Sequence, residues 1–193
     1  MLVALDNQTK AALVKSGFFE LWDHAQKKAW YGHREEVHAL TQFLTWEEMT
    51  CLDGLRESRR RRKKRALEKI EAMMPHNPIF VTLTFNDATL ERTTPQQRRL
   101  LVVRYLKAHA SQYLANIDFG KDNGREHYHV ICVPKTGSMP RKPWERYGNP
   151  NFERLRHSKS PKAVSTYIIK FTHHAFKEST CQRGLPRLIY SRS

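Results

Sequence analysis

A pair of prolines, Pro75 and Pro78, divides the chain into two stretches with different hydrophobic periodicity. Proline ends helices and holds the preceding residue in an extended conformation. Apolar residues before the pair, such as Val37 and Leu40, recur at helical spacings, whereas residues 79–85 alternate in the manner of a strand. We therefore predict a helical N-terminal extension followed by a domain that contains a sheet. The predicted domains are residues 1–75 and 76–193.

The second stretch contains alternating signals for strands and helices. Thr94 and Pro95 are a typical N-cap and first helical residue, and Ser160 and Pro161 repeat this pattern. The expected elements are strands at 79–85, 113–119, 127–133 and 187–190, helices at 96–110 and from 161 onward, and a long loop at 134–160. This β-α-β-β-α-β order predicts an α+β fold with a central antiparallel β-sheet and flanking helices.

The charge of the chain indicates a polyanionic partner. Its 193 residues include 34 Lys and Arg against 19 Asp and Glu, a formal charge of +15 and a pI near 10.0. Nucleic acid is the first expectation, because such an excess of cations attracts phosphates. The longest aliphatic run, Leu100–Val103, is far shorter than the roughly 18 residues of a membrane span, so no membrane role is expected. Three widely spaced cysteines and no signal-peptide pattern favour a cytoplasmic protein.

Seven consecutive cations precede the proline pair. On a helix they cover every side, so each has like-charged neighbours three and four residues away, which costs a few tenths of a kcal/mol per pair. Contact with DNA phosphates would compensate this repulsion, and a solvated connector is the alternative. The predicted DNA-binding residues of the run are Arg59, Arg60, Arg61, Arg62, Lys63, Lys64 and Arg65.

Two histidines flank one aromatic residue at His127-Tyr128-His129, and apolar residues follow them. A strand has a side-chain period of two, so both imidazoles point to the same face of a sheet. Imidazole is the commonest side-chain metal ligand, and two on one face can bind one ion. The alternative is a half-buried pair satisfied by backbone partners.

Tyr167 and Lys170 lie three residues apart on the last expected helix, so they are neighbours on one flank. That flank borders the apolar stripe and can face a cleft. An activated tyrosine can act as a covalent nucleophile, and an adjacent lysine can stabilise a phenolate or a phosphate. A tyrosine at the edge of the core with an extended lysine is the alternative.

The strand Phe80–Phe85, the His127-Tyr128-His129 motif and the Tyr167-x-x-Lys170 motif occur in this order over roughly residues 78–193. The ordered trio resembles the HUH endonuclease superfamily, most closely the rolling-circle replication initiators of small phages and plasmids. The resemblance implies a nuclease domain with an RRM-like sheet, and a bacterial or archaeal host cell. It also implies Mg²⁺ or Mn²⁺ held by His127, His129 and a third polar ligand on the preceding strand, where Asp118 lies. Glu126 is the alternative third ligand, although its side chain should point to the opposite face.

The resemblance further implies an activity. Tyr167 would attack a phosphate of single-stranded DNA at a replication origin, leaving a 5′-phosphotyrosine and a free 3′-OH, with Lys170 offsetting negative charge. A single-tyrosine transposase or relaxase of a mobile element and a non-catalytic basic DNA-binding protein remain alternatives. The chain has no P-loop motif, so a separate or host helicase and a polymerase are the expected partners, without a nucleotide cofactor. Additional DNA contacts are expected in the long loop, from Arg141, Lys142 and Trp144.

Overall fold

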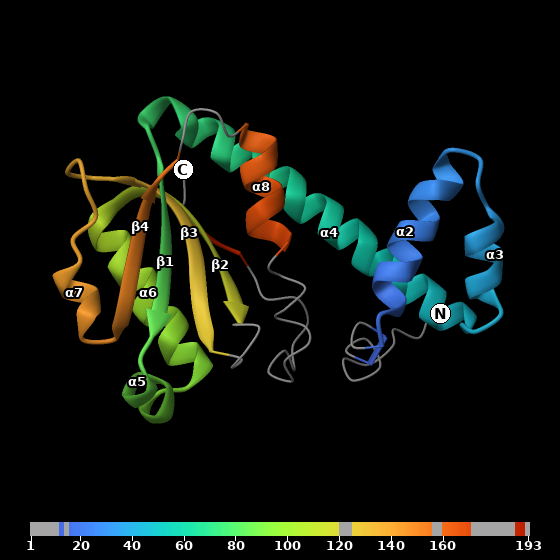
Figure 1. Cartoon of the computed structure of the whole chain (residues 1–193), viewed down its shortest axis with the longest axis horizontal. Coiled ribbons are helices and arrows are strands. Elements are labelled where there is room, and N and C mark those ends of the chain that lie inside the picture. Colours follow the sequence, from blue (N-terminus) through green and yellow to red (C-terminus); the bar gives the residue numbers. More distant parts are fainter. Residues whose placement is uncertain (1–11, 14–15, 120–124, 156–159, 171–187, 192–193) are drawn as a thin grey trace. The chain divides into compact units, whose positions relative to one another are not determined.

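The computed structural model describes residues 12–13, 16–119, 125–155, 160–170 and 188–191, except for the side chains of Tyr167, Ile169 and Lys170 (Figure 1). Its described residues form two compact units, one up to Arg62 and the other from Lys63 onward. The predicted boundary after residue 75 stays a prediction. None of the described helices combines the length and hydrophobicity needed to cross a membrane.

The first unit is helical. It comprises α2 (Phe18–Trp30), α3 (Glu35–Thr41) and the first part of α4 (Trp46–Met73). Thr45 caps α4, because its hydroxyl accepts from the Glu48 amide and the Glu48 carboxylate accepts from the Thr45 amide. A buried apolar cluster holds the three helices together, and its buried members are Leu13, Phe19, Trp22, Leu44 and Leu52.

The second unit is built on a five-stranded sheet in the order β4-β1-β3-β2-β5, with every neighbouring pair antiparallel. This sheet and the helical N-terminal part confirm the predicted α+β fold. The strands are β1 (Ile79–Phe85), β2 (Ala110–Phe119), β3 (Glu126–Pro134), β4 (Gly148–Arg154) and β5 (Ile189–Tyr190). The helical elements of this unit are the end of α4, η1 (Met74–His76), α5 (Asp87–Arg92), α6 (Pro95–His109), α7 (Lys142–Glu145) and α8 (Pro161–Lys170).

The alternation of side chains along the strands separates two hydrophobic clusters. Helix α6 covers one face, where Val102 and Leu106 pack against Val81 and Leu83 of β1 (Figure 1). The Thr94 capping box and Pro95 begin this helix as predicted. On the opposite face the ends of α4 and α8 cover part of the sheet, and the buried residues there are Ala66, Ile70, Met73, Phe80, Leu114, Ile131, Val164 and Ile168.

Strand β4 is an element that the sequence did not predict. It lies within residues 134–160, which were expected to form a loop, and pairs with β1 at the edge of the sheet. Its sequence contains Gly148 and Pro150, which are uncommon in strands, but proline is tolerated on an edge strand because one side of the ladder is unpaired. A side chain at Gly148 would meet the Thr84 carbonyl oxygen at 1.9 Å, so this close approach requires glycine.

Candidate metal centre

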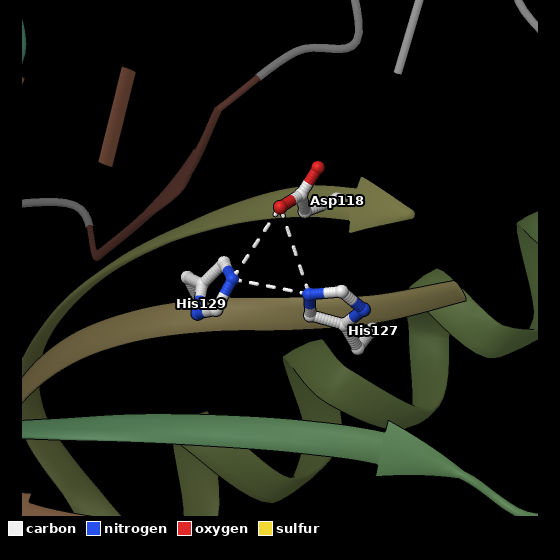
Figure 2. Close-up of side chains that lie close together, drawn as sticks. All are labelled: Asp118, His127 and His129. Carbon is white, nitrogen blue, oxygen red and sulfur yellow. Dashed lines mark hydrogen bonds and ion pairs between the residues drawn. The ribbon is translucent and has the colours of Figure 1, made fainter. Parts of the chain in front are cut away.

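The predicted metal ligands lie together at one end of the sheet. His127 and His129 project from the same face of β3, and Asp118 of β2 lies directly opposite His127 in the strand register. Figure 2 shows the two imidazoles and the carboxylate pointing toward one another. All three side chains are largely buried, with Asp118 only 3% exposed. Strand alternation places the histidines on one face, and the β2–β3 pairing adds the carboxylate.

The separations of the three donor atoms suit a single metal ion. His127 Nε2 lies 3.1 Å from His129 Nε2, and Asp118 Oδ2 lies 3.6 and 3.5 Å from these two nitrogens. Two donors that are each about 2.1 Å from one ion are about 3.0 Å apart at a right angle and about 3.4 Å apart at the tetrahedral angle. The three side chains could therefore hold a metal ion without rearrangement of the strands.

The other ring nitrogens have partners that orient both imidazoles. His127 Nδ1 lies 3.0 Å from the Arg125 carbonyl oxygen, and His129 Nδ1 lies 3.3 Å from the Thr82 hydroxyl on β1. A carbonyl oxygen only accepts, so His127 donates from Nδ1 and, in its neutral form, keeps the Nε2 lone pair toward Asp118. The Phe80 ring also stacks on His129 at 5.4 Å. Such outer contacts fix ring orientation and tautomer in metal sites.

The protonation equilibria of the three groups are coupled through their proximity. Burial raises the pKa of Asp118, but the neighbouring imidazoles of His127 and His129 and the Phe119 amide outweigh burial and leave the pKa below its usual value. Burial lowers the pKa of His127, but Asp118 and the Arg125 carbonyl outweigh it and raise the pKa. Burial lowers the pKa of His129, and the net shift is also downward. Asp118 is thus charged at neutral pH, which favours a bound cation.

Glu126, the alternative third ligand, points to the opposite face of β3. Its Oε2 accepts hydrogen bonds from Arg98 of α6, at 2.8 Å from Nε and 2.6 Å from an Nη atom. The same guanidinium donates to the carbonyl oxygens of Leu90 and Thr93. Burial raises the pKa of Glu126 more than Arg98 lowers it. Glu126 is therefore part of a buried ion pair in the core and not of the histidine group.

Helix α8 packs against the face of the sheet that carries the predicted metal ligands. Its Ile168 lies in the cluster with Leu114 of β2, and the Ile168 carbonyl accepts a hydrogen bond from the Asn116 side chain at 2.9 Å. The backbone of Tyr167 and Lys170 belongs to this helix. Their side chains lie outside the described part of the structure, so their predicted roles stay predictions.

The basic run lies on α4, and its members differ in their contacts. Arg59 donates to Asp23 of α2 at 3.0 Å and lies over the Phe19 ring, so it has a structural partner in the first unit. Arg60 and Arg61 are exposed and pair with Glu57 on their own helix. Exposed side chains continue the run at Lys63, Lys64 and Arg65, and Arg62 is partly exposed. The Asp23 carboxylate therefore competes with a phosphate for Arg59.

The three residues of the 134–160 region that were predicted to contact DNA also differ in their exposure to solvent. Trp144 is 0% exposed and donates from Nε1 to the Thr84 carbonyl at 3.3 Å. It packs in the core, which was the alternative for this loop, and presents no ring surface to a nucleic acid. Arg141 and Lys142 are exposed. Arg141 lies at the edge strand, near Asn149 and over the Phe152 ring.

Sequence reasoning missed Asn116 and the role of Thr82. Asn116 precedes Asp118 by the two-residue period of a strand, so the sequence already placed both on one face. Thr82 belongs to the alternating strand predicted at 79–85, but its contact with His129 depended on the β1–β3 register. No family model, curated protein or solved structure matches this chain. The geometry of the chain itself is therefore the evidence for the candidate site.

Proposed function

We propose that this chain is a metal-dependent endonuclease that nicks and rejoins single-stranded DNA and initiates rolling-circle replication. The observation that carries the proposal is the convergence of Asp118, His127 and His129 within 4.8 Å on a sheet face against which a tyrosine-bearing helix packs. The formal charge of +15 supports a polyanionic substrate. The order of the three sequence motifs supports the same class of enzyme.

The donor set bears on the choice of metal. Imidazole nitrogens suit transition metals, carboxylate oxygens suit Mg²⁺ and Mn²⁺, and Mn²⁺ accepts both. Of the two expected ions, Mn²⁺ therefore fits two imidazoles and one carboxylate better. When bound, such an ion supplies Lewis-acid polarisation of the scissile phosphate.

The residues of the chain have separate roles in this reaction. The Tyr167 phenolic oxygen attacks phosphorus, the bond to the 3′-oxygen breaks, and a 5′-phosphotyrosine forms. The phenolic proton passes to solvent, and the leaving 3′-oxygen takes up a proton to become a 3′-OH. Lys170, one turn further along α8, offsets the charge of the phenolate or phosphate. Exposed cations of the basic run and of the β4 edge hold the flanking backbone without reading its sequence.

The test is covalent capture of DNA. The full chain is incubated with Mn²⁺ and a labelled pool of random-sequence single-stranded oligonucleotides, and SDS-resistant adducts are counted. We expect adducts with wild type and with the control Tyr190→Phe, whose tyrosine lies on β5. We expect none with Tyr167→Phe or when a chelator removes the metal.

The opposite outcomes are equally informative. Adducts with Tyr167→Phe would reject this tyrosine as the nucleophile. A wild-type chain that binds Mn²⁺ and the oligonucleotides but forms no adduct would reject the enzyme and support a non-catalytic DNA-binding protein. Sequencing of the captured oligonucleotides would identify the nick site, and its occurrence at a replication origin or at the end of a mobile element separates the initiator from the transposase or relaxase.

A further inference from the structure

Asn116 is a buried amide in the middle of β2, beside the metal ligands. It pairs with His129 in the β2–β3 register and lies two residues before Asp118, so its side chain shares their face of the sheet. It is 1% exposed. Neighbours on this face, Leu114 and Ile131, are apolar. This polar side chain therefore lies between the apolar contact with α8 and the polar Asp118 and His129.

The two ends of the amide have different environments. Nδ2 donates to the Ile168 carbonyl oxygen of α8 at 2.9 Å. Oδ1 is buried and has no hydrogen-bond partner among the described residues. A buried acceptor without a partner costs stability, and an apolar side chain of similar size would avoid that cost. Stability alone thus gives no reason for an amide here, whereas a requirement for the Nδ2 bond does.

The bond restrains helix α8 in a way that the apolar contacts do not. Val164 and Ile168 pack against the sheet, but hydrophobic contacts have no direction and tolerate small rotations and shifts of the helix. A hydrogen bond is directional and selects one separation. It acts on Ile168, the residue after Tyr167, so it restrains the helix where the predicted nucleophile is attached.

We propose that Asn116 is a positioning residue, which holds α8 at the height and rotation that place Tyr167 beside the Asp118–His127–His129 group. This inference rests on the proposed function. Reactive groups need to be held near their attack geometry, and a misplacement of about 1 Å can reduce a rate by about a hundredfold. Loss of the Asn116 bond should therefore slow adduct formation without changing metal binding.

The experiment compares Asn116→Leu with Leu114→Val in the full chain. Leucine has nearly the size of asparagine but donates no hydrogen bond. The control shortens a side chain on the same strand and face and weakens packing on α8, but leaves the Asn116 bond in place. If Asn116→Leu does not fold, Asn116→Val replaces it, because valine favours strands. The readouts are the Mn²⁺ dissociation constant from calorimetry and single-turnover adduct formation with oligonucleotides captured by wild type.

We expect the rate constant of adduct formation to fall at least about tenfold in Asn116→Leu, with an unchanged Mn²⁺ dissociation constant and an unchanged half-saturating oligonucleotide concentration. Leu114→Val should keep the wild-type rate constant. A purely structural role for Asn116 would lower the amplitude, which counts folded molecules, and leave the rate constant unchanged.

Three results would overturn the inference. A wild-type rate constant in Asn116→Leu would show that the bond does not position the nucleophile. Weakened Mn²⁺ binding that accounts for the rate loss would place the effect on the metal ligands. Absence of adduct with wild type itself would reject the proposed function, and the inference with it, which separates that failure from the first two.

Discussion

The two faces of the paired strands β2 and β3 each carry a buried carboxylate next to nitrogen bases, but the partners differ in chemistry. On the α6 face, Glu126 faces the guanidinium of Arg98, which stays charged and cannot bind a cation. On the other face, Asp118 faces two imidazoles, which lose a proton readily and then offer lone pairs. The first arrangement is a buried ion pair and the second is a set of possible metal donors. The nature of the base therefore decides whether a buried carboxylate is only part of an ion pair or could also be a metal ligand.

The largest effect is expected on the α6 face. Arg98→Met should lower the free energy of unfolding by about 3–5 kcal/mol, because the Glu126 carboxylate is left buried and uncompensated. Chemical denaturation measures this difference. Arg104→Met, an exposed arginine on the same helix, is the matched control and should stay within about 0.5 kcal/mol of wild type. A double variant with Glu126→Gln should recover much of the loss, and no recovery would argue against the buried ion pair.

The second-largest effect is expected on the sheet face that carries Asp118, His127 and His129. His129→Ala should weaken Mn²⁺ binding at least about a hundredfold, because one of three donors is removed. Calorimetric titration with MnCl₂ measures it. Glu126→Gln on the opposite face is the control and should leave the affinity within about threefold of wild type, because Glu126 does not face the ion. Equal losses of Mn²⁺ affinity in His129→Ala and Glu126→Gln would contradict the view that only one face of the sheet provides metal ligands.

A third buried carboxylate, Asp23 in the helical unit, extends the comparison. It bonds Lys27, Arg56 and Arg59. Burial raises its pKa, but these cations outweigh burial and leave the pKa below its usual value of 3.8. A lowered pKa means that the stabilisation is complete above the usual value and is lost as the pH falls through the folded-state pKa.

Asp23→Asn should therefore lower the free energy of unfolding at pH 7 by about 2 kcal/mol. The difference from wild type should shrink once the pH is below 3.8. Denaturation at pH 7 and at several acidic pH values measures it. Asp53→Asn is the control and should show little change, since an amide oxygen can still accept the Trp22 Nε1 bond. A difference that is independent of pH would exclude the charge as its cause.

The smallest effect is expected at Thr82, whose hydroxyl contacts a predicted metal ligand, His129, rather than the metal. Thr82→Val removes the hydroxyl next to His129 Nδ1 and keeps a side chain of the same shape. We expect Mn²⁺ affinity to fall about tenfold, because outer contacts of ligating histidines contribute at this level. Thr84→Val, two residues along the same strand face, is the control and should keep the wild-type affinity. The same calorimetric titration distinguishes them, and an unchanged Thr82→Val would show that the contact does not orient His129.

Local chemistry made several elements predictable from the sequence. The capping residues Thr94 and Ser160 begin helices where expected, because a cap depends on residues within one turn. The alternation of β1 and the shared face of His127 and His129 follow from the two-residue period of a strand. Strand β4 was missed because its pairing with β1, rather than its own composition, makes it a strand.

The sequence by itself determined that two imidazoles share a face of a strand and that the chain is strongly basic. The tertiary structure decided which carboxylate joins the imidazoles, because the β2–β3 register sets Asp118 opposite His127 while Glu126 turns to Arg98. It also buried Trp144, and it brought the Asn116 amide to the Ile168 carbonyl. The physical reason is range: alternation and capping act within a few residues, whereas strand register and helix packing join residues tens of positions apart.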